Sequence, residues 1–177
     1  MVIATTELDL CDCGALVPKI DGPTHAYFGN NAGCWQLFGE VLARDYADYQ
    51  HGALHNLAVD TYAVQHPRNA DRRNRQSVGV HLISLRALLE RNLDAAKART
   101  LIADIAFAQR RHRWEWPHLV PPTLGATTVV EVHSATTPEE HREQIHRWAH
   151  GVWQAFAEHH TLVRQWLDAA WQDSRVN

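Results

Sequence analysis

The sequence predicts an all-α protein: a five-helix, bundle-like single domain over residues 1–177, with an irregular N-terminal segment and a long C-terminal helix. Three observations favour this fold class. Apolar residues recur at helical spacing over most of residues 33–173. The β-branched run Thr127–Val132 has no obvious partner strand. The length of 177 residues, with 45% apolar and 21% charged residues, is enough for one well-buried core.

The N-terminal part is predicted to be an irregular segment followed by two helices. Glycine, proline and asparagine interrupt residues 1–31 and break any long period there. From residue 33 onward, an apolar stripe at i, i+3 and i+4 predicts a helix over 33–48. A second helix over 52–66 is expected to end at Pro67, which has no backbone N–H to continue the helical hydrogen bonds.

Two more predicted helices follow, each after an aspartate that can cap it. Asp71 precedes a helix over 72–91, and Asp94 precedes a helix over 95–111. Each helix carries an apolar stripe along one side. Because the connections are short, consecutive helices are expected to pack as antiparallel neighbours.

The C-terminal part is predicted to be a loop and then one long helix. Residues 112–136 are rich in tryptophan and proline, and Thr127–Val132 within them is expected to be an extended connector. Thr137 and Pro138 then provide an N-cap and a favourable first residue for a helix over 137–173.

Composition and charge exclude several classes of protein. A formal net charge of −3 argues against a general nucleic-acid binder, which needs an excess of basic residues. No run approaches the ~18 apolar residues of a membrane span, so no membrane partner is expected. No secretory signal precedes the three cysteines, which cluster in the first fifth of the chain. We therefore expect a cytoplasmic protein whose thiols are free or bound to metal.

Histidine is unusually frequent, with 13 residues, and one predicted helix concentrates it. On a helical projection, His51, His55, Tyr62 and His66 fall within about 60° of one another. A helix that turns imidazoles and a phenol toward its packed side is a candidate functional site.

The register of antiparallel helices brings further ligands to the level of this face. Turns near residues 50 and 69 would place Asp45 and His81 level with His55. Another histidine interrupts the apolar stripe of the last helix. The predicted metal ligands are therefore His55, His81 and His159, with Asp45 and Glu40 as carboxylates. This mixture suits zinc first, with iron or copper as alternatives, rather than magnesium or calcium.

Catalytic and pocket residues can be assigned around such a metal. Tyr62 would act as acid or base, or would position a substrate. Asp60 or Gln65 would orient an imidazole ligand. Trp35 and Trp153 would line an aromatic pocket. The resulting hypothesis is a small metal-dependent enzyme that acts on a small molecule in the bundle interior.

A second metal site is indicated by the cysteines. Cys11 and Cys13 resemble half of a zinc knuckle, although their spacing is one residue shorter than the usual Cys-x-x-Cys. Cys34 and His25 could complete the four ligands. In this alternative the protein is a non-enzymatic interaction module with a structural zinc clamp, and its other histidines are structural.

A third hypothesis is a bundle that binds haem. In that case an imidazole would serve as the axial ligand of the iron. The candidates are His55, His66 and His159. This hypothesis predicts a visible Soret band in the purified protein.

Several short runs, spread over nearly the whole chain, match a family pattern. They are Cys13-Gly14, Gly22-Pro23-Thr24-His25-Ala26-Tyr27, Gly33-Cys34-Trp35, His55 to Pro67, Gln76 to Ile83, and Val152 to His160. The chain thus resembles a bacterial family of uncharacterised helical proteins, a domain-of-unknown-function family. Its members often have Cys-x-x-Cys-Gly near the start, where this chain has Cys11-x-Cys13-Gly14, and this departure counts against an N-terminal zinc knuckle. The resemblance implies no activity. It does imply that the family pattern includes Cys13, His25, Cys34, His55, Asp60, Tyr62, Gln65, His66 and His81.

Overall fold

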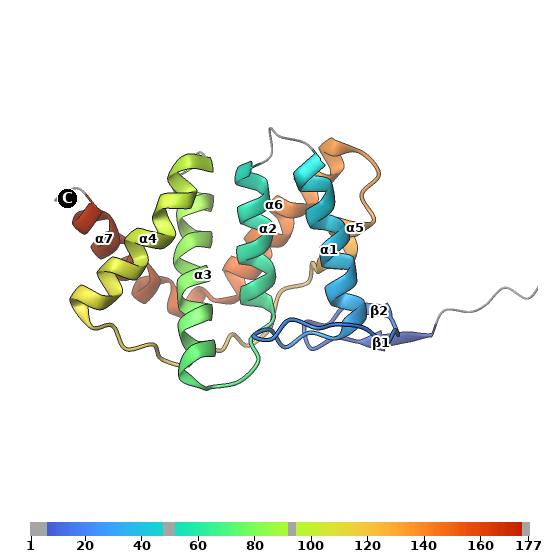
Figure 1. Cartoon of the computed structure of the whole chain (residues 1–177), viewed down its shortest axis with the longest axis horizontal. Helices are drawn as coiled ribbons and strands as arrows, with labels where there is room; N and C mark the ends of the chain where they lie inside the picture. Colours follow the sequence, from blue (N-terminus) through green and yellow to red (C-terminus); the bar gives the residue numbers. More distant parts are fainter. Residues whose placement is uncertain (1–6, 48–51, 92–94, 175–177) are drawn as a thin grey trace, which may run out of the picture.

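The structure of the protein is a computed structural model that describes residues 7–47, 52–91 and 95–174. In this part of the chain the prediction of a mostly helical fold is confirmed, with one small sheet in addition (Figure 1). The strands are β1 (Leu8–Leu10) and β2 (Leu16–Pro18), and the helices are α1 (Ala32–Ala47), α2 (Gly52–Gln65), α3 (Arg72–Arg91), α4 (Ala95–His112), α5 (Val129–His133), α6 (Pro138–Ala155), the 3-10 helix η2 (Ala157–His159) and α7 (His160–Ser174).

Helices α1 to α4 begin and end within one residue of their predicted ranges. Local signals account for this agreement. The Asp71 carboxylate accepts a hydrogen bond of 2.9 Å from the Asn74 backbone N–H, so Asp71 caps α3 as predicted. Pro67 follows the end of α2. The predicted Asp94 cap and His51, on the predicted histidine face, lie outside the described residues.

The N-terminal segment, predicted to be irregular, contains an antiparallel hairpin of β1 and β2. Leu10 pairs with Leu16, and Gly14 in the turn between them has a φ of +89°, which favours glycine. Val17 is fully buried, and the start of α1 lies so close to β2 that a Cβ at Gly33 would collide with the β2 backbone. Each strand has only three residues, so the alternation of apolar and polar residues is too short to predict a strand from the sequence.

Most of the β-branched run Thr127–Val132 belongs to a short helix, α5, which begins at Val129, and the prediction of an extended connector is wrong. Thr128 and Glu131 form a reciprocal capping box. The Glu131 carboxylate accepts a hydrogen bond of 2.6 Å from the Thr128 backbone N–H, while the Thr128 hydroxyl accepts one from Val130 at 3.2 Å. This local pairing outweighs the weak preference of valine for strands.

The predicted long helix over 137–173 is divided into α6 and α7, with η2 between them. The predicted Thr137 cap is present at the start of α6. Helix α6 ends at Ala155, and Phe156 follows with φ −92° and ψ +21°, outside the helical range. The predicted count of five helices is therefore not confirmed, since the described residues form seven α-helices.

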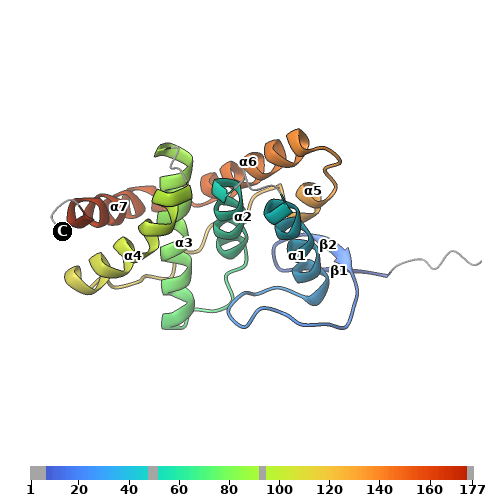
Figure 2. The same cartoon turned by 45° about the horizontal axis from the view of Figure 1, so that its top comes forward.

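Contacts between side chains stabilise the bend between α6 and α7. The His160 ring stacks on Trp153, with ring centroids 3.8 Å apart, and its Nε2 lies 2.8 Å from the Trp153 carbonyl oxygen. The bend lets α6 pack on α2 and α5, while α7 packs on α3 and α4 (Figure 2). No glycine or proline marks this bend in the sequence, so the helical period alone could not reveal it.

Helix α2 is the centre of the molecule. Figure 1 shows α1, α2 and α3 side by side with α2 in the middle; α5 and α6 lie behind α1 and α2, and α7 lies behind α3 and α4. The largest side chains of the core are fully buried and come from both groups of helices, among them Tyr62, Leu82, Ile145, Trp148 and Phe156. Among the described residues, no helix is both long and apolar enough to span a membrane.

Candidate metal centre

Three cysteines and one histidine meet at the foot of α1 and α2. Their sulfur and ring nitrogen atoms all lie within 4.8 Å of one another, and all four residues are buried. Cys11 and Cys13 belong to the turn of the β-hairpin, Cys34 to the first turn of α1, and His66 follows the last residue of α2. Among the described residues, this is the group of histidine, cysteine and carboxylate side chains that is close enough to hold an ion.

The hairpin turn places the first two thiols together. The Cys11 backbone N–H donates to the Ala15 carbonyl at 2.9 Å, and the Gly14 N–H donates to the Cys11 carbonyl at 2.8 Å. Because Gly14 adopts a left-handed conformation, the chain reverses within this turn. Cys11 and Cys13 are each only 3% exposed, although they lie in a turn, because both side chains point into the protein.

Helix ends position the other two ligands. Asn31 caps α1, since its Oδ1 accepts a hydrogen bond of 2.9 Å from the Cys34 backbone N–H. His66 is placed just beyond α2, where Pro67 prevents a further turn. Helices α1 and α2 are joined by a short connection, so the start of one and the end of the other lie at the same end of the pair.

The His66 ring is held in one orientation. Its Nδ1 lies 2.8 Å from the Tyr62 carbonyl oxygen and donates to it, and the ring stacks on the Tyr62 ring with centroids 3.9 Å apart. The other nitrogen, Nε2, lies 3.3 Å from the Cys34 sulfur. A histidine whose Nδ1–H is bound to a carbonyl presents a lone pair on Nε2, which is the form that binds metals.

A second layer of polar groups surrounds the sulfurs. The Tyr62 hydroxyl donates to the Cys34 sulfur at 3.5 Å and accepts a hydrogen bond of 2.8 Å from the Asn30 side-chain amide. Burial, followed by the nearby Cys34 side chain, raises the pKa of Tyr62 well above its usual range. The phenol therefore keeps its proton and remains a donor to the sulfur.

Without a bound cation, the four ligand groups compete for protons. Hydrogen bonds from Cys13 and Cys34 lower the pKa of Cys11, while the same network raises the pKa of Cys34. Burial alone would lower the pKa of His66, but hydrogen bonds to Cys11 and Cys13 raise it to about 9. The cluster thus stabilises thiolate charge next to a protonated imidazole, and a divalent cation could replace those protons.

The spacing of the four atoms fits a small tetrahedral ion. A Zn–S bond of about 2.3 Å implies sulfurs about 3.8 Å apart at the corners of a tetrahedron. All ligand atoms here lie within 4.8 Å of one another, so small side-chain rotations would bring them to that distance. Three sulfurs and one imidazole nitrogen are one of the donor sets that tetrahedral metal sites use.

The other predicted ligands are not brought together. Three carboxylates each pair with a different histidine, and the N–O distance is 2.7 Å in every pair. These pairs are Glu40 with His133, Asp45 with His141, and Asp60 with His81. His133 of α5 and His141 of α6 lie more than 90 residues from their carboxylate partners in the chain. Reasoning from the pairing of consecutive helices therefore could not predict these contacts.

The remaining predicted site residues are dispersed as well. His55 is half-buried on α2, and His159 lies in η2 with its Nε2 3.4 Å from the Val120 carbonyl oxygen. Trp35 packs near Tyr62, with centroids 5.9 Å apart, whereas Trp153 stacks on His160, so these two tryptophans do not share a pocket.

Three of the four residues in the alternative cysteine site do meet, and His66, in place of His25, is the fourth residue of the group. The His25 ring instead stacks on Phe28, with centroids 4.0 Å apart. Burial, followed by the nearby His81, lowers the pKa of His25. A signal for His66 was available: residues 34 and 66 are equally far from residue 50, so antiparallel pairing places Cys34 level with His66.

Comparison with known proteins identifies a family for this chain. A family model described as "Family of unknown function (DUF5946)" matches residues 9–157. The match covers most of the chain, which therefore belongs to this family, and the resemblance to a helical family of unknown function is confirmed. No curated protein and no solved structure matched in the same comparisons.

Proposed function

We propose that this member of the DUF5946 family is a zinc-clamped interaction module, in which one Zn²⁺ ion fixes the N-terminal hairpin to the helical body. The observation that supports this is the buried group of Cys11, Cys13, Cys34 and His66. A soft, sulfur-rich donor set with one imidazole selects zinc over magnesium or calcium, and zinc needs no redox partner.

A structural role agrees with the donor set better than a catalytic one. Four protein ligands complete the tetrahedral shell of zinc, whereas catalytic zinc sites keep one position for water or substrate. All four ligand residues are buried, so solvent has little access to the centre. The ion would contribute folding free energy rather than activate a substrate.

The hairpin is the element that needs such a clamp. Two paired strands of three residues are only marginally stable in water on their own. Their outer face carries three leucines that are more than half exposed, Leu8, Leu10 and Leu16. A metal-anchored hairpin that presents apolar side chains is typical of a surface that contacts another molecule.

The metal content of the purified protein tests this proposal. We expect about one equivalent of zinc in protein purified without added metal, and a visible spectrum of tetrahedral Co²⁺ bound to thiolates after exchange with cobalt. Less than about a tenth of an equivalent of any transition metal, together with failure to take up cobalt, would contradict it.

Two pairs of variants identify the ligands. His66→Ala should abolish stoichiometric zinc, whereas His25→Ala should leave it unchanged, because the His25 ring stacks on Phe28 outside the cluster. His66→Cys keeps a donor at the same place and should retain the metal. If His66→Ala failed to fold, retention of zinc by His66→Cys and the cobalt spectrum of that variant would still decide the assignment.

A further inference from the structure

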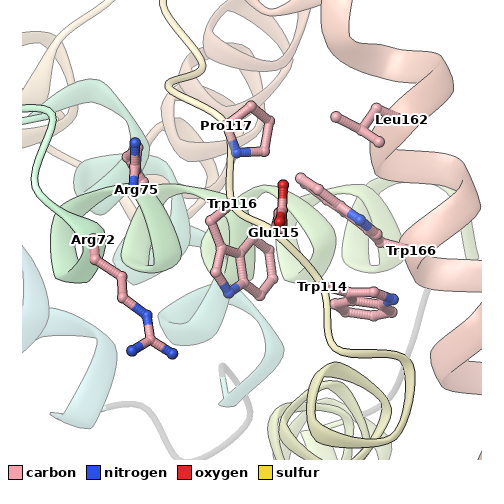
Figure 3. Close-up of a pocket in the computed structure, with 8 residues that line it drawn as sticks. All are labelled: Arg72, Arg75, Trp114, Glu115, Trp116, Pro117, Leu162 and Trp166. Atoms are coloured by element: carbon pink, nitrogen blue, oxygen red, sulfur yellow. The ribbon is translucent and has the colours of Figure 1, made fainter.

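A cavity of about 710 Å³ opens between α3, α7 and the segment that follows α4 (Figure 3). None of its residues belongs to the metal centre. Eight residues line it: Arg72, Arg75, Trp114, Glu115, Trp116, Pro117, Leu162 and Trp166. Its volume is in the range of pockets that hold small molecules.

Three indoles form the apolar wall of this cavity. The Trp116 and Trp166 ring centroids are 4.8 Å apart, and Trp114 lies 5.9 Å from Trp166. Trp116 is seated against α3 at Gly79, where a Cβ would collide with the six-membered part of its ring. Packed aromatic rings of this kind offer flat apolar surface, on which another planar ring can stack.

The polar groups of the cavity are mostly donors. Arg72 and Arg75 have no carboxylate within ion-pair distance among the described residues, and neither has Glu115 an ion-pair partner there. The Trp116 Nε1 and the Arg75 Nε are buried and have no hydrogen-bond partner in the described structure. Trp116 is only 6% exposed, and Figure 3 shows its ring nitrogen on the side nearer to the Arg72 guanidinium.

Two unpaired guanidinium groups against one carboxylate leave the cavity with a net positive charge. Buried donors without acceptors are costly, and a bound acceptor would remove that cost. Arginine also binds carboxylates and phosphates through two parallel hydrogen bonds. The chemistry therefore favours an anion, and the indole wall favours one with an aromatic body.

We propose that this cavity binds a small aromatic anion, either a carboxylate or a phosphate ester. Its ring lies against the indole wall, and its acidic group meets the Arg72 guanidinium, which Figure 3 shows on the side of the Trp116 ring nitrogen. The Glu115 carboxylate stands beside this position and accepts a hydrogen bond from any N–H at the edge of the ligand ring. This site is separate from the metal centre and does not depend on the zinc proposal.

Calorimetric titration of the full chain with two matched pairs of probes tests the proposal. Indole-3-acetate is compared with the neutral indole-3-acetamide, and adenosine monophosphate with adenosine. We expect at least one anion to bind at least tenfold more tightly than its neutral partner, because only the anion can form charge-assisted hydrogen bonds with a guanidinium group. Preference for the first anion identifies a carboxylate ligand, and preference for the second identifies a phosphate ester.

Single-charge variants assign the binding to this cavity. Arg72 is exposed, so Arg72→Gln should fold normally and should weaken binding of the preferred anion about tenfold. Arg147→Gln removes the same charge from an exposed position on α6 and should leave binding unchanged. Equal affinity for anions and neutral partners, no dissociation constant below about 1 mM, or the same affinity in both variants would overturn the proposal.

Discussion

Among single residues, Tyr62 connects the candidate metal centre to the aromatic core of the protein. Its carbonyl oxygen orients the His66 ring, its hydroxyl donates to the Cys34 sulfur, and its ring stacks on Phe38 with centroids 3.8 Å apart. The sequence predicts a catalytic or positioning role for this phenol. In the structure it is fully buried, and it contacts Cys34 and His66 of the candidate metal centre.

The hydroxyl of Tyr62 can be tested by itself. Tyr62→Phe removes the donor to Cys34 but keeps the ring and its stacking, so we expect a folded protein that binds zinc about 10–100-fold more weakly. Competition with a chromophoric chelator measures this affinity. Tyr27→Phe, at an exposed tyrosine, is the control and should bind zinc as the unchanged protein does. Equal affinities in both variants would show that the hydroxyl has no influence on the metal.

At the scale of elements, the packing of the segment after α4 against α3 requires a glycine, which has no side chain, at position 79. Gly79 lies inside α3, where alanine would normally be favoured, yet the Trp116 ring occupies the space that a Cβ would need. This position therefore sets the distance between α3 and the indole wall of the cavity.

Two glycine-to-alanine changes in helices should have opposite effects. Gly79→Ala should lower the free energy of unfolding by about 1–3 kcal/mol, since the Trp116 ring would have to move. Gly39→Ala, in α1 with open space around it, should raise the free energy of unfolding by about 0.5–1 kcal/mol, because alanine favours the helix. Urea unfolding compares the two, and a stabilising Gly79→Ala would mean that Trp116 does not pack there.

Elements that depend on local signals were predictable, and those that depend on distant contacts were not. Asp71 and Pro67 lie next to the helices that they delimit, and α1 to α4 were predicted within one residue. The bend after Phe156 depends on His160 and Trp153 in a folded α6–α7 unit, and the helical period continues through it. The predicted carboxylates Asp45 and Glu40 lie next to histidines of α6 and α5, which short connections do not bring near.

At the scale of the whole molecule, the candidate metal centre brings together parts of the chain that lie far apart in the sequence. Its ligands span Cys11 to His66 and include the hairpin, the start of α1 and the end of α2. Closing a long stretch of chain restricts the unfolded state, so a bound ion would stabilise the fold by entropy as well as by its bonds.

Zinc should stabilise the protein less as the solution becomes acidic. Coordination needs a neutral His66 and deprotonated thiols, so protons compete with the metal when the pH falls below about 9, the pKa of His66 in the metal-free centre. The raised pKa of His66 also reduces the stabilisation by zinc at low pH, because it stabilises the metal-free fold there. It stabilises the metal-free fold fully below the unfolded value of 6.5, and this contribution is lost as the pH rises through about 9.

Thermal unfolding measures this dependence. We expect the difference in Tm between protein with excess zinc and protein with chelator to be large at pH 8 and clearly smaller at pH 6. Protein stripped of zinc and returned to excess zinc at pH 8 serves as the control for irreversible damage. A difference in Tm that does not change with pH would indicate that the histidine and thiols are not the groups that bind the ion.

The bend after Phe156 coincides with another boundary. The family match ends at residue 157, so all four metal ligands lie inside the shared region, whereas Leu162 and Trp166 of the cavity lie beyond it. The two candidate sites therefore differ in how far the family match covers them: the group of Cys11, Cys13, Cys34 and His66 is covered completely, and the cavity only in part.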